Sequence, residues 1–252
     1  MFDSHPNYRF VVSQMRALGG ENAKALDYGC GRGETVRLAR AAGIDMVGAD
    51  VFYDGNDARD VVVKSGDFGQ TLFEMKDGRL PFPSNHFDIV GSNQVFEHVD
   101  DLDLALSEIR RVLKPGGVFV NIFPSIGVLR EGHCGVALAH WLNPLPRAQR
   151  RYLQLWRALG FGYRTRGRTC AAWAAYFSDY LRRFTHYRSR RAILKAYSAH
   201  FASVEHHEVA FAEYRLRIRG RNGAADMASR LRWLTAWAVR RLGSMVIVAK
   251  RA

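Results

Sequence analysis

A short strand that runs through a glycine-rich turn into a helix constrains this chain more than any other feature. Residues 25–28 are apolar apart from Asp27, residues 29–33 read Gly-Cys-Gly-Arg-Gly, and residues 34–42 have helical spacing until Gly43. A second apolar strand, residues 46–51, follows directly. Strand, helix and strand in this order predict a right-handed crossover in a parallel sheet. Ligands of such sheets bind at the carboxyl ends of the strands, where the glycine turn lies.

The remaining sheet is predicted from short apolar runs between helical stretches. The third strand has two candidates, residues 61–64 and 71–75, of which 71–75 is preferred. Further strands are predicted at 87–92, 118–123 and 244–249, and helices at 8–18 and 100–114. Residues 200–218 also offer strand-like material. The order of elements predicts an α/β fold.

The alternation of strand and helix lapses after Pro124. Residues 132–197 are mainly helical by periodicity and rich in aromatic residues and arginine, which favours a lid over the active-site edge. The predicted organisation is a cofactor-binding core over residues 1–130, a helical substrate lid over 131–200, and C-terminal strands with an amphipathic helix over 201–252 that complete the core.

The formal charge of +13 is the compositional outlier, and most of the excess follows Arg130. A negative partner is expected: a phosphorylated small molecule, a lipid-linked glycan precursor at an anionic membrane, or RNA. A basic surface that only aids solubility fits equally well. Three scattered cysteines, an N-terminus unlike a secretory signal and no apolar run of membrane-spanning length predict a cytoplasmic protein.

The acids near the turn select the kind of ligand. A dinucleotide fingerprint would have glycine at position 34, whereas Glu34 would repel a pyrophosphate. A ligand with an ammonium group and a sulfonium would instead be favoured by Asp27. Asp50, at the end of the second strand, is placed to accept the hydroxyls of a ribose, and Val51 to cover an adenine. S-adenosylmethionine has all of these groups.

Four motifs together identify a family. Residues 25–33 (ALDYGCGRG), Leu80-Pro81-Phe82-Pro83 with Phe87-Asp88, Glu97-His98-Val99, and 108–117 ending in Arg-Val-Leu-Lys-Pro-Gly-Gly resemble class I S-adenosylmethionine-dependent methyltransferases in order and spacing. The resemblance covers roughly residues 24–124, and the last motif is typical of the branch that modifies small molecules. It implies a Rossmann-like sheet, mostly parallel with an antiparallel last strand, and a helical lid inserted after the fifth strand.

The resemblance also implies roles for residues. It puts Asp27, Gly29 and Gly31 around the methionine moiety and Asn93 and Gln94 beside the amino group and sulfonium. An acid before the Leu-Pro-Phe element would contact the adenine: Asp77 is preferred, and Asp67 is its rival. The predicted cofactor site is therefore Asp27, Gly29, Cys30, Gly31, Asp50, Val51, Asp77, Asn93 and Gln94.

Histidines supply the candidates for the acceptor side. His98 follows the fourth strand and titrates near neutral pH, so it is the first candidate for a general base, and the alternative is a packing role. His133 and His140 are second choices. A metal site of His133, Cys134 and His140 lacks a fourth ligand, so no metal is predicted.

The C-terminal region predicts one amphipathic helix over residues 227–242, which either rests on an anionic membrane or packs on the sheet. The predicted function is methyl transfer from S-adenosylmethionine to a small or lipid- or glycan-linked acceptor, with a hydroxyl oxygen favoured. The alternatives are an RNA methyltransferase and a non-catalytic binding protein of the same fold.

Overall fold

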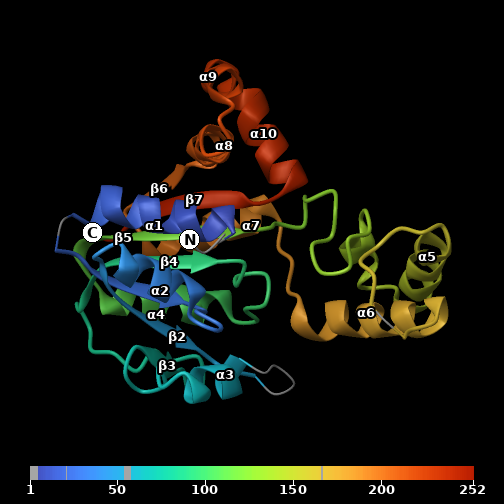
Figure 1. The fold of residues 1–252 in the computed structure, drawn as a ribbon, viewed down its shortest axis with the longest axis horizontal. Coiled ribbons are helices and arrows are strands. Elements are labelled where there is room, and N and C mark those ends of the chain that lie inside the picture. The colour runs from blue at the N-terminus through green and yellow to red at the C-terminus, as the bar shows by residue number, and fades with distance from the viewer. Residues whose placement is uncertain (1–4, 21, 54–57, 166) are drawn as a thin grey trace.

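A seven-stranded sheet organises the chain in a computed structural model, which describes residues 5–20, 22–53, 58–165 and 167–252. Its strands are β1 (Lys24–Tyr28), β2 (Asp45–Asp50), β3 (Leu72–Glu74), β4 (Phe87–Asn93), β5 (Leu113–Phe123), β6 (Ser203–His206) and β7 (Met245–Lys250). The order is β3-β2-β1-β4-β5-β7-β6, and β7 runs antiparallel to β5 (Figure 1). The predicted mostly parallel sheet with an antiparallel last strand is confirmed. The expectation of no secretory signal rests partly on residues 1–4, which lie outside the described residues.

Helices cover both faces of this sheet and bury two apolar clusters. On one face lie α1 (Pro6–Gly19) and α2 (Glu34–Ala41), with Phe10 and Met15 fully buried against the strands. On the other face lie α4 (Leu102–Val112) and α7 (Arg190–His200), with Leu106 and Tyr197 in the second cluster. Because β1 and β4 are apolar on both sides, they lie at the centre of the sheet.

Several local predictions are settled by packing. The preference for residues 71–75 as the third strand is confirmed by β3, and the rival segment forms α3 (Ala58–Lys64). The strand-like interpretation of 200–218 is right only for β6, because α8 (Glu208–Arg217) follows. In α8, Phe211 packs edge-on against Phe10 of α1 with ring centroids 5.0 Å apart. Tertiary contact therefore overrides the strand-like composition.

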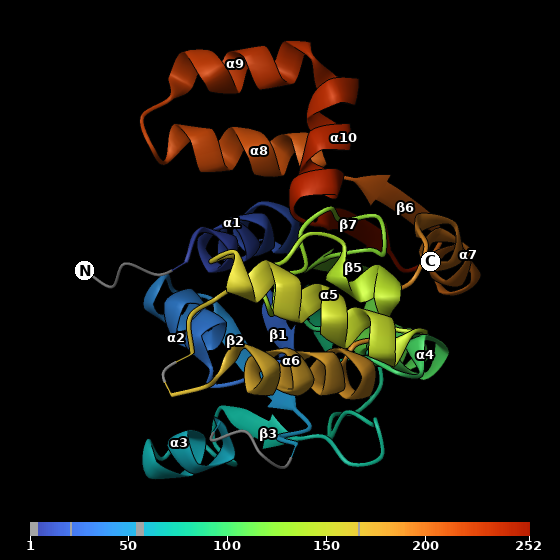
Figure 2. The same ribbon diagram turned by 90° about the vertical axis from the view of Figure 1, so that its right-hand side faces the viewer.

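The single helix predicted over residues 227–242 is wrong. The chain forms α9 (Asn222–Arg230) and α10 (Arg232–Leu242), which meet at the non-helical residue Leu231. No residue of α10 is fully buried, but Val239 packs against the apolar cluster that α1 and the sheet enclose, so the helix is partly covered. Figure 2 shows α8, α9 and α10 as a group beyond one edge of the sheet.

The helical segment after β5 has a small core of its own. It comprises η1 (Ala139–Leu142), α5 (Pro146–Ala158) and α6 (Cys170–Phe184), which enclose Cys134, Leu153 and Trp173. Figure 1 shows α5 and α6 standing off from the sheet, whereas α7 lies back against it and contributes Ile193 and Tyr197 to the cluster under α4. The segment that stands off is therefore shorter than residues 131–200. No described helix is long and apolar enough to cross a membrane.

Candidate active site

The glycine turn after β1 is held by backbone hydrogen bonds and by close packing. Gly29 N–H and Cys30 N–H both donate to the carbonyl of Ala49 on β2, at 2.8 and 3.1 Å. Gly29 has φ +78°, and a Cβ there would lie 2.4 Å from a methyl carbon of Val95. Gly31 also has a positive φ, +52°, but a Cβ there would meet no atom within 4 Å. The turn needs glycine at position 29 because Val95 leaves no room for a Cβ, whereas position 31 faces open space.

Asp50 fixes the turn from the neighbouring strand. One of its carboxylate oxygens, Oδ2, accepts from Gly31 N–H at 2.8 Å, and the other, Oδ1, accepts from Phe52 N–H at 2.9 Å. Each carboxylate oxygen keeps a further acceptor direction. The side chain is therefore oriented by the backbone and can still accept hydroxyl donors from a ligand.

A cavity of about 850 Å³ opens where the carboxyl ends of β1, β2 and β4 meet. This volume lies within the range of roughly 300–1,000 Å³ that is usual for small-molecule sites. Among the predicted residues, the structure brings these to its wall: Asp27, Gly29, Cys30, Gly31, Asp50, Val51, Asn93, Gln94 and His98.

Asp27 is the most perturbed acid of the cavity. It is only 3% exposed, and burial raises its pKa to about 8, a shift that the hydrogen bond to Thr35 opposes and the neighbouring Asp50 and Glu34 carboxylates increase. A cation placed beside it would lower that pKa and favour the ionised form. The inner end of the cavity is thus suited to a positively charged group.

The N-terminal helix supplies wall residues that sequence reasoning missed. Asn7 donates from Nδ2 to Asn93 Oδ1 at 3.3 Å, and its own Oδ1 is buried with no hydrogen-bond partner among the described residues. His5, Tyr8, Glu34 and Thr35 also line the cavity. No motif signals that residues 5–8 fold back over β4, so the sequence offered no means of finding them.

Neither predicted adenine acid lies on the cavity wall. Asp77 is absent from it, although the adjacent Gly78 lines it. Asp67 accepts from Arg37 at 3.0 Å and from Ser65 at 2.8 Å, and it borders a separate small pocket. The cavity wall therefore contains neither Asp67 nor Asp77, although Met75 and Gly78 on either side of Asp77 do line it.

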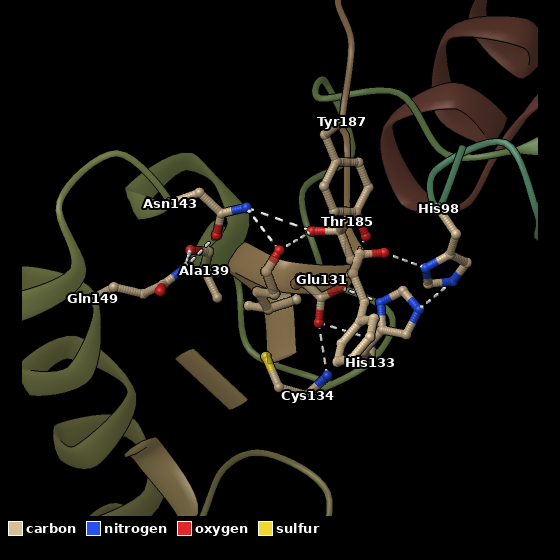
Figure 3. Close-up of polar contacts among 11 residues, drawn as sticks. His98, Glu131, His133, Cys134, Ala139, Asn143, Gln149, Thr185 and Tyr187 are labelled. Carbon is tan, nitrogen blue, oxygen red and sulfur yellow. Dashed lines mark hydrogen bonds and ion pairs between the residues drawn. The ribbon is translucent and has the colours of Figure 1, made fainter. Parts of the chain in front are cut away.

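Two of the three predicted catalytic histidines meet at the edge of the cavity. His98 Nε2 lies 3.1 Å from His133 Nε2, and His133 Nδ1 lies 2.6 Å from Glu131 Oε1 (Figure 3). The other ring nitrogen of His98, Nδ1, lies 2.5 Å from the carbonyl oxygen of Phe184 at the end of α6. His98 itself lines the cavity, but both of its ring nitrogens are engaged.

The pKa values of these two histidines are shifted in opposite directions. Burial lowers the pKa of His98 to about 4. For His133, burial also lowers the pKa, but the hydrogen bond and charge of Glu131 outweigh it and leave the pKa raised. Glu131 is buried too, yet His133, Tyr187 and the backbone hold its pKa down at about 2.

His140 does not join this group. It is 2% exposed, its Nε2 lies 3.1 Å from the carbonyl oxygen of Ile126, and it is not on the cavity wall. Its ring packs against Tyr187 with centroids 4.6 Å apart. His140 is placed to support the loop after β5 rather than to face a substrate.

Known proteins resemble this chain most clearly around the turn. A family model described as "Methyltransferase domain" matches residues 26–121. The demethylmenaquinone methyltransferase of Bacillus subtilis is 39% identical over 123 residues, which cover 47% of this chain and 52% of that protein. The mitochondrial arginine-hydroxylase NDUFAF5 of Homo sapiens is 34% identical over 117 residues, 46% of this chain and 32% of that one. This chain thus matches about a quarter to a half of the length of its curated relatives.

The fold comparison extends over the whole chain. An S-adenosylmethionine-dependent methyltransferase from Mesorhizobium loti has a TM-score of 0.57 and 18% identity, with 99% of both chains covered. Residues 26–121 thus match a methyltransferase domain, and the chain as a whole shares the fold of this solved structure, which agrees with the resemblance found in the sequence.

The residues present fit that cofactor. The orphan acceptor of Asn7, the buried carboxyl of Asp27 and the open space at Gly31 all lie on one cavity wall. A ligand with an ammonium group would supply the donors and the positive charge that this wall lacks.

Proposed function

We propose that this protein binds S-adenosylmethionine in the cavity at the glycine turn and transfers its methyl group to an oxygen of a small, anionic acceptor. The observation that carries the proposal is the acidic wall of that cavity. Asp27 would hold the ammonium group, Asp50 the ribose hydroxyls, and Asn93 the region of the sulfonium. When bound, the cofactor supplies an electrophilic methyl group. The protein contributes chiefly by holding the acceptor oxygen close and in line.

The acceptor side of the cavity supports the choice of an anionic acceptor. Arg183 and Phe184, from the end of α6, line the cavity, and the tilted ring of Tyr53 packs against Phe184 with centroids 5.7 Å apart. An aromatic wall with a guanidinium suits an apolar body that carries a carboxylate or phosphate. The segment of η1, α5 and α6 would serve as the lid, since its last turn forms this wall.

Calorimetric titration with S-adenosylmethionine and S-adenosylhomocysteine tests the cofactor. Asp50→Ala removes the acceptor of Gly31 N–H, and we expect at least a tenfold loss of affinity. Asp67→Ala is the matched control, because Asp67 lies outside the cavity and should leave affinity unchanged. Absence of binding by the folded native protein would refute the proposal.

Methyl transfer must be measured separately, because the relatives include a protein named as a hydroxylase. We would incubate the protein with S-adenosylmethionine carrying a labelled methyl group and with hydroxylated acceptors that do or do not carry a phosphate. Label is expected in the phosphorylated acceptors. Cofactor binding without label in any of them would favour the non-catalytic alternative.

A peripheral membrane position extends the proposal to lipid-linked acceptors. Trp233 is 76% exposed, and Met227, Trp237 and Leu242 are also exposed on α9 and α10 beside the exposed Arg230. Exposed aromatic rings next to cations favour an anionic bilayer surface. We expect co-sedimentation with phosphatidylglycerol vesicles, weakened in Trp233→Ser and unchanged in Trp141→Ser. Equal sedimentation with neutral vesicles, or none at all, would contradict it.

A further inference from the structure

Three side chains that can ligate a metal ion converge beside the cavity. They are those of Glu97, His98 and His133, from the turn after β4 and the loop after β5 (Figure 3 shows the two histidines). One potential ligand atom from each residue lies within 4.8 Å of the others. This is a different set from His133, Cys134 and His140, for which the sequence analysis predicted no metal.

The two imidazoles are oriented by oxygen atoms at their other nitrogens. Glu131 Oε1 lies 2.6 Å from His133 Nδ1, and the carbonyl oxygen of Phe184 lies 2.5 Å from His98 Nδ1. Both oxygens are acceptors, so each Nδ1 carries a proton and donates it. In a neutral imidazole with this tautomer, Nε2 is an unprotonated acceptor. Two such lone pairs therefore face each other across 3.1 Å.

The buried carboxylate of Glu97 favours a bound cation over a proton shared between the two histidines. A single proton between the two rings would satisfy both histidines. It would leave Glu97 Oε2 buried and unpartnered among the described residues, in a side chain that is only 2% exposed. A buried acceptor without a donor loses the hydrogen bonds that water would give it in the unfolded chain. One divalent cation would satisfy all three atoms at once.

We propose that Glu97, His98 and His133 bind a divalent transition-metal ion of the Zn²⁺ type. Two imidazole nitrogens and one carboxylate oxygen form a donor set that such ions prefer. The 3.1 Å between the two Nε2 atoms is close to the roughly 3.3 Å that separates ligands of a tetrahedral ion with bonds of about 2.0 Å. The oxygens behind the imidazoles, from Glu131 and Phe184, are the partners that metal-bound histidines characteristically have.

Three protein ligands leave a coordination position for another group. Because His98 lines the cofactor cavity, that position lies at the acceptor side. A hydroxyl oxygen bound there would lose its proton more readily than a free hydroxyl, and this would explain why neither ring nitrogen of His98 faces the cavity as a free base. This role rests on the proposed methyl transfer, whereas the metal site itself does not.

The test is metal binding by the whole protein after treatment with a chelator. We expect about one equivalent of Zn²⁺ by calorimetry and a visible absorption spectrum with Co²⁺ that differs from that of aqueous Co²⁺. Glu97→Gln keeps the shape of the side chain but removes its charge, and together with His133→Gln it should weaken Zn²⁺ binding at least tenfold. Glu131→Gln changes the oxygen behind His133 Nδ1, together with the acceptor of Tyr187 and of two backbone N–H groups, and should weaken Zn²⁺ binding about 10–100-fold.

His200→Gln is the matched control, because His200 contacts Asp103 at the far end of α7. Its Zn²⁺ affinity should equal that of the native protein. Absence of Zn²⁺ binding by the native protein would overturn the proposed site. So would a Glu97 or His133 variant that keeps the native circular dichroism spectrum and binds Zn²⁺ as tightly as the native protein. S-adenosylmethionine titrated in parallel separates the two proposals: binding of the cofactor without Zn²⁺ would refute only the metal site.

Discussion

Replacing Asp27 by asparagine should remove a pH dependence from the stability of the ligand-free protein. In the folded state burial raises the pKa of Asp27 from 3.8 to about 8. Between these pH values the folded chain keeps a proton that the unfolded chain has lost. Stability therefore falls as pH rises through this window, and an asparagine, which does not ionise, should not contribute to the fall.

The magnitude follows from the shift. Each pKa unit corresponds to about 1.4 kcal/mol, so a carboxyl whose pKa is raised by this much would lower the free energy of unfolding by up to about 5 kcal/mol at pH about 8. Water penetration and relaxation reduce such penalties, and we expect about 2–3 kcal/mol. Asp27→Asn should match the native protein near pH 4 and be more stable by that amount near pH 8.

Urea unfolding followed by circular dichroism at several pH values measures this difference. The other charged groups cancel between the two proteins, except Asp50 and Glu34, which act on Asp27 directly. Asp45→Asn serves as control, because Asp45 is an exposed acid paired with Arg40 at 3.7 Å. The reasoning would be refuted if the difference in free energy of unfolding between Asp27→Asn and the native protein stayed constant from pH about 5 to about 8.

Three further substitutions test the packing of the glycine turn and of the core. Gly29→Ala should destabilise the protein by about 2–4 kcal/mol in urea unfolding, because it combines a positive φ with a clash at Val95. Gly31→Ala has the positive φ without a clash and should cost only about 1 kcal/mol. Equal losses of stability in the two variants would contradict the clash. Tyr197→Phe removes the hydroxyl that accepts from Asn121 Nδ2 at 2.7 Å in the buried core, and a loss of about 1–3 kcal/mol is expected in the thermal transition. An unchanged transition would mean that water replaces the hydroxyl.

The cofactor side of the site was predictable because its signals are local. Glycines in a turn between a strand and a helix, and an acid at the end of the next strand, specify their own surroundings within a few residues. Gly29 and Asp50 accordingly lie where the pattern places them. Asp77 stays a prediction, because Met75 and Gly78 on either side of it line the cavity while Asp77 itself does not.

The acceptor side was not predictable in the same way. His98 and His133 are 35 positions apart, and their contact depends on how the loop after β5 returns to the turn after β4. Glu97 was visible only as part of a motif, since its burial and its unpartnered oxygen are consequences of packing. The sequence instead drew attention to Cys134, next to His133, but its buried side chain packs in the separate core under α5 and α6.

Two of the motifs that carry the resemblance, the Leu-Pro-Phe element and the run at the end of α4, are explained by contacts with each other. Arg111 donates to the carbonyl oxygens of Leu80 and Phe82 at 3.0 and 2.8 Å, and it binds both carboxylate oxygens of Glu108. Glu108 in turn accepts from Leu80 N–H at 2.9 Å. The Leu-Pro-Phe element and the end of α4 therefore depend on each other, which accounts for their joint occurrence.

None of these hydrogen bonds involves a residue of the cavity wall. Glu108 and Arg111 hold the segment before β4 against α4, and this anchors Leu80 in the core beside the cofactor cavity. A chain can therefore keep this arrangement while the residues after β5 change with the substrate. Variants of Arg111 should lower stability and leave the choice of acceptor unaltered, whereas variants of Arg183 should alter the choice of acceptor without loss of stability.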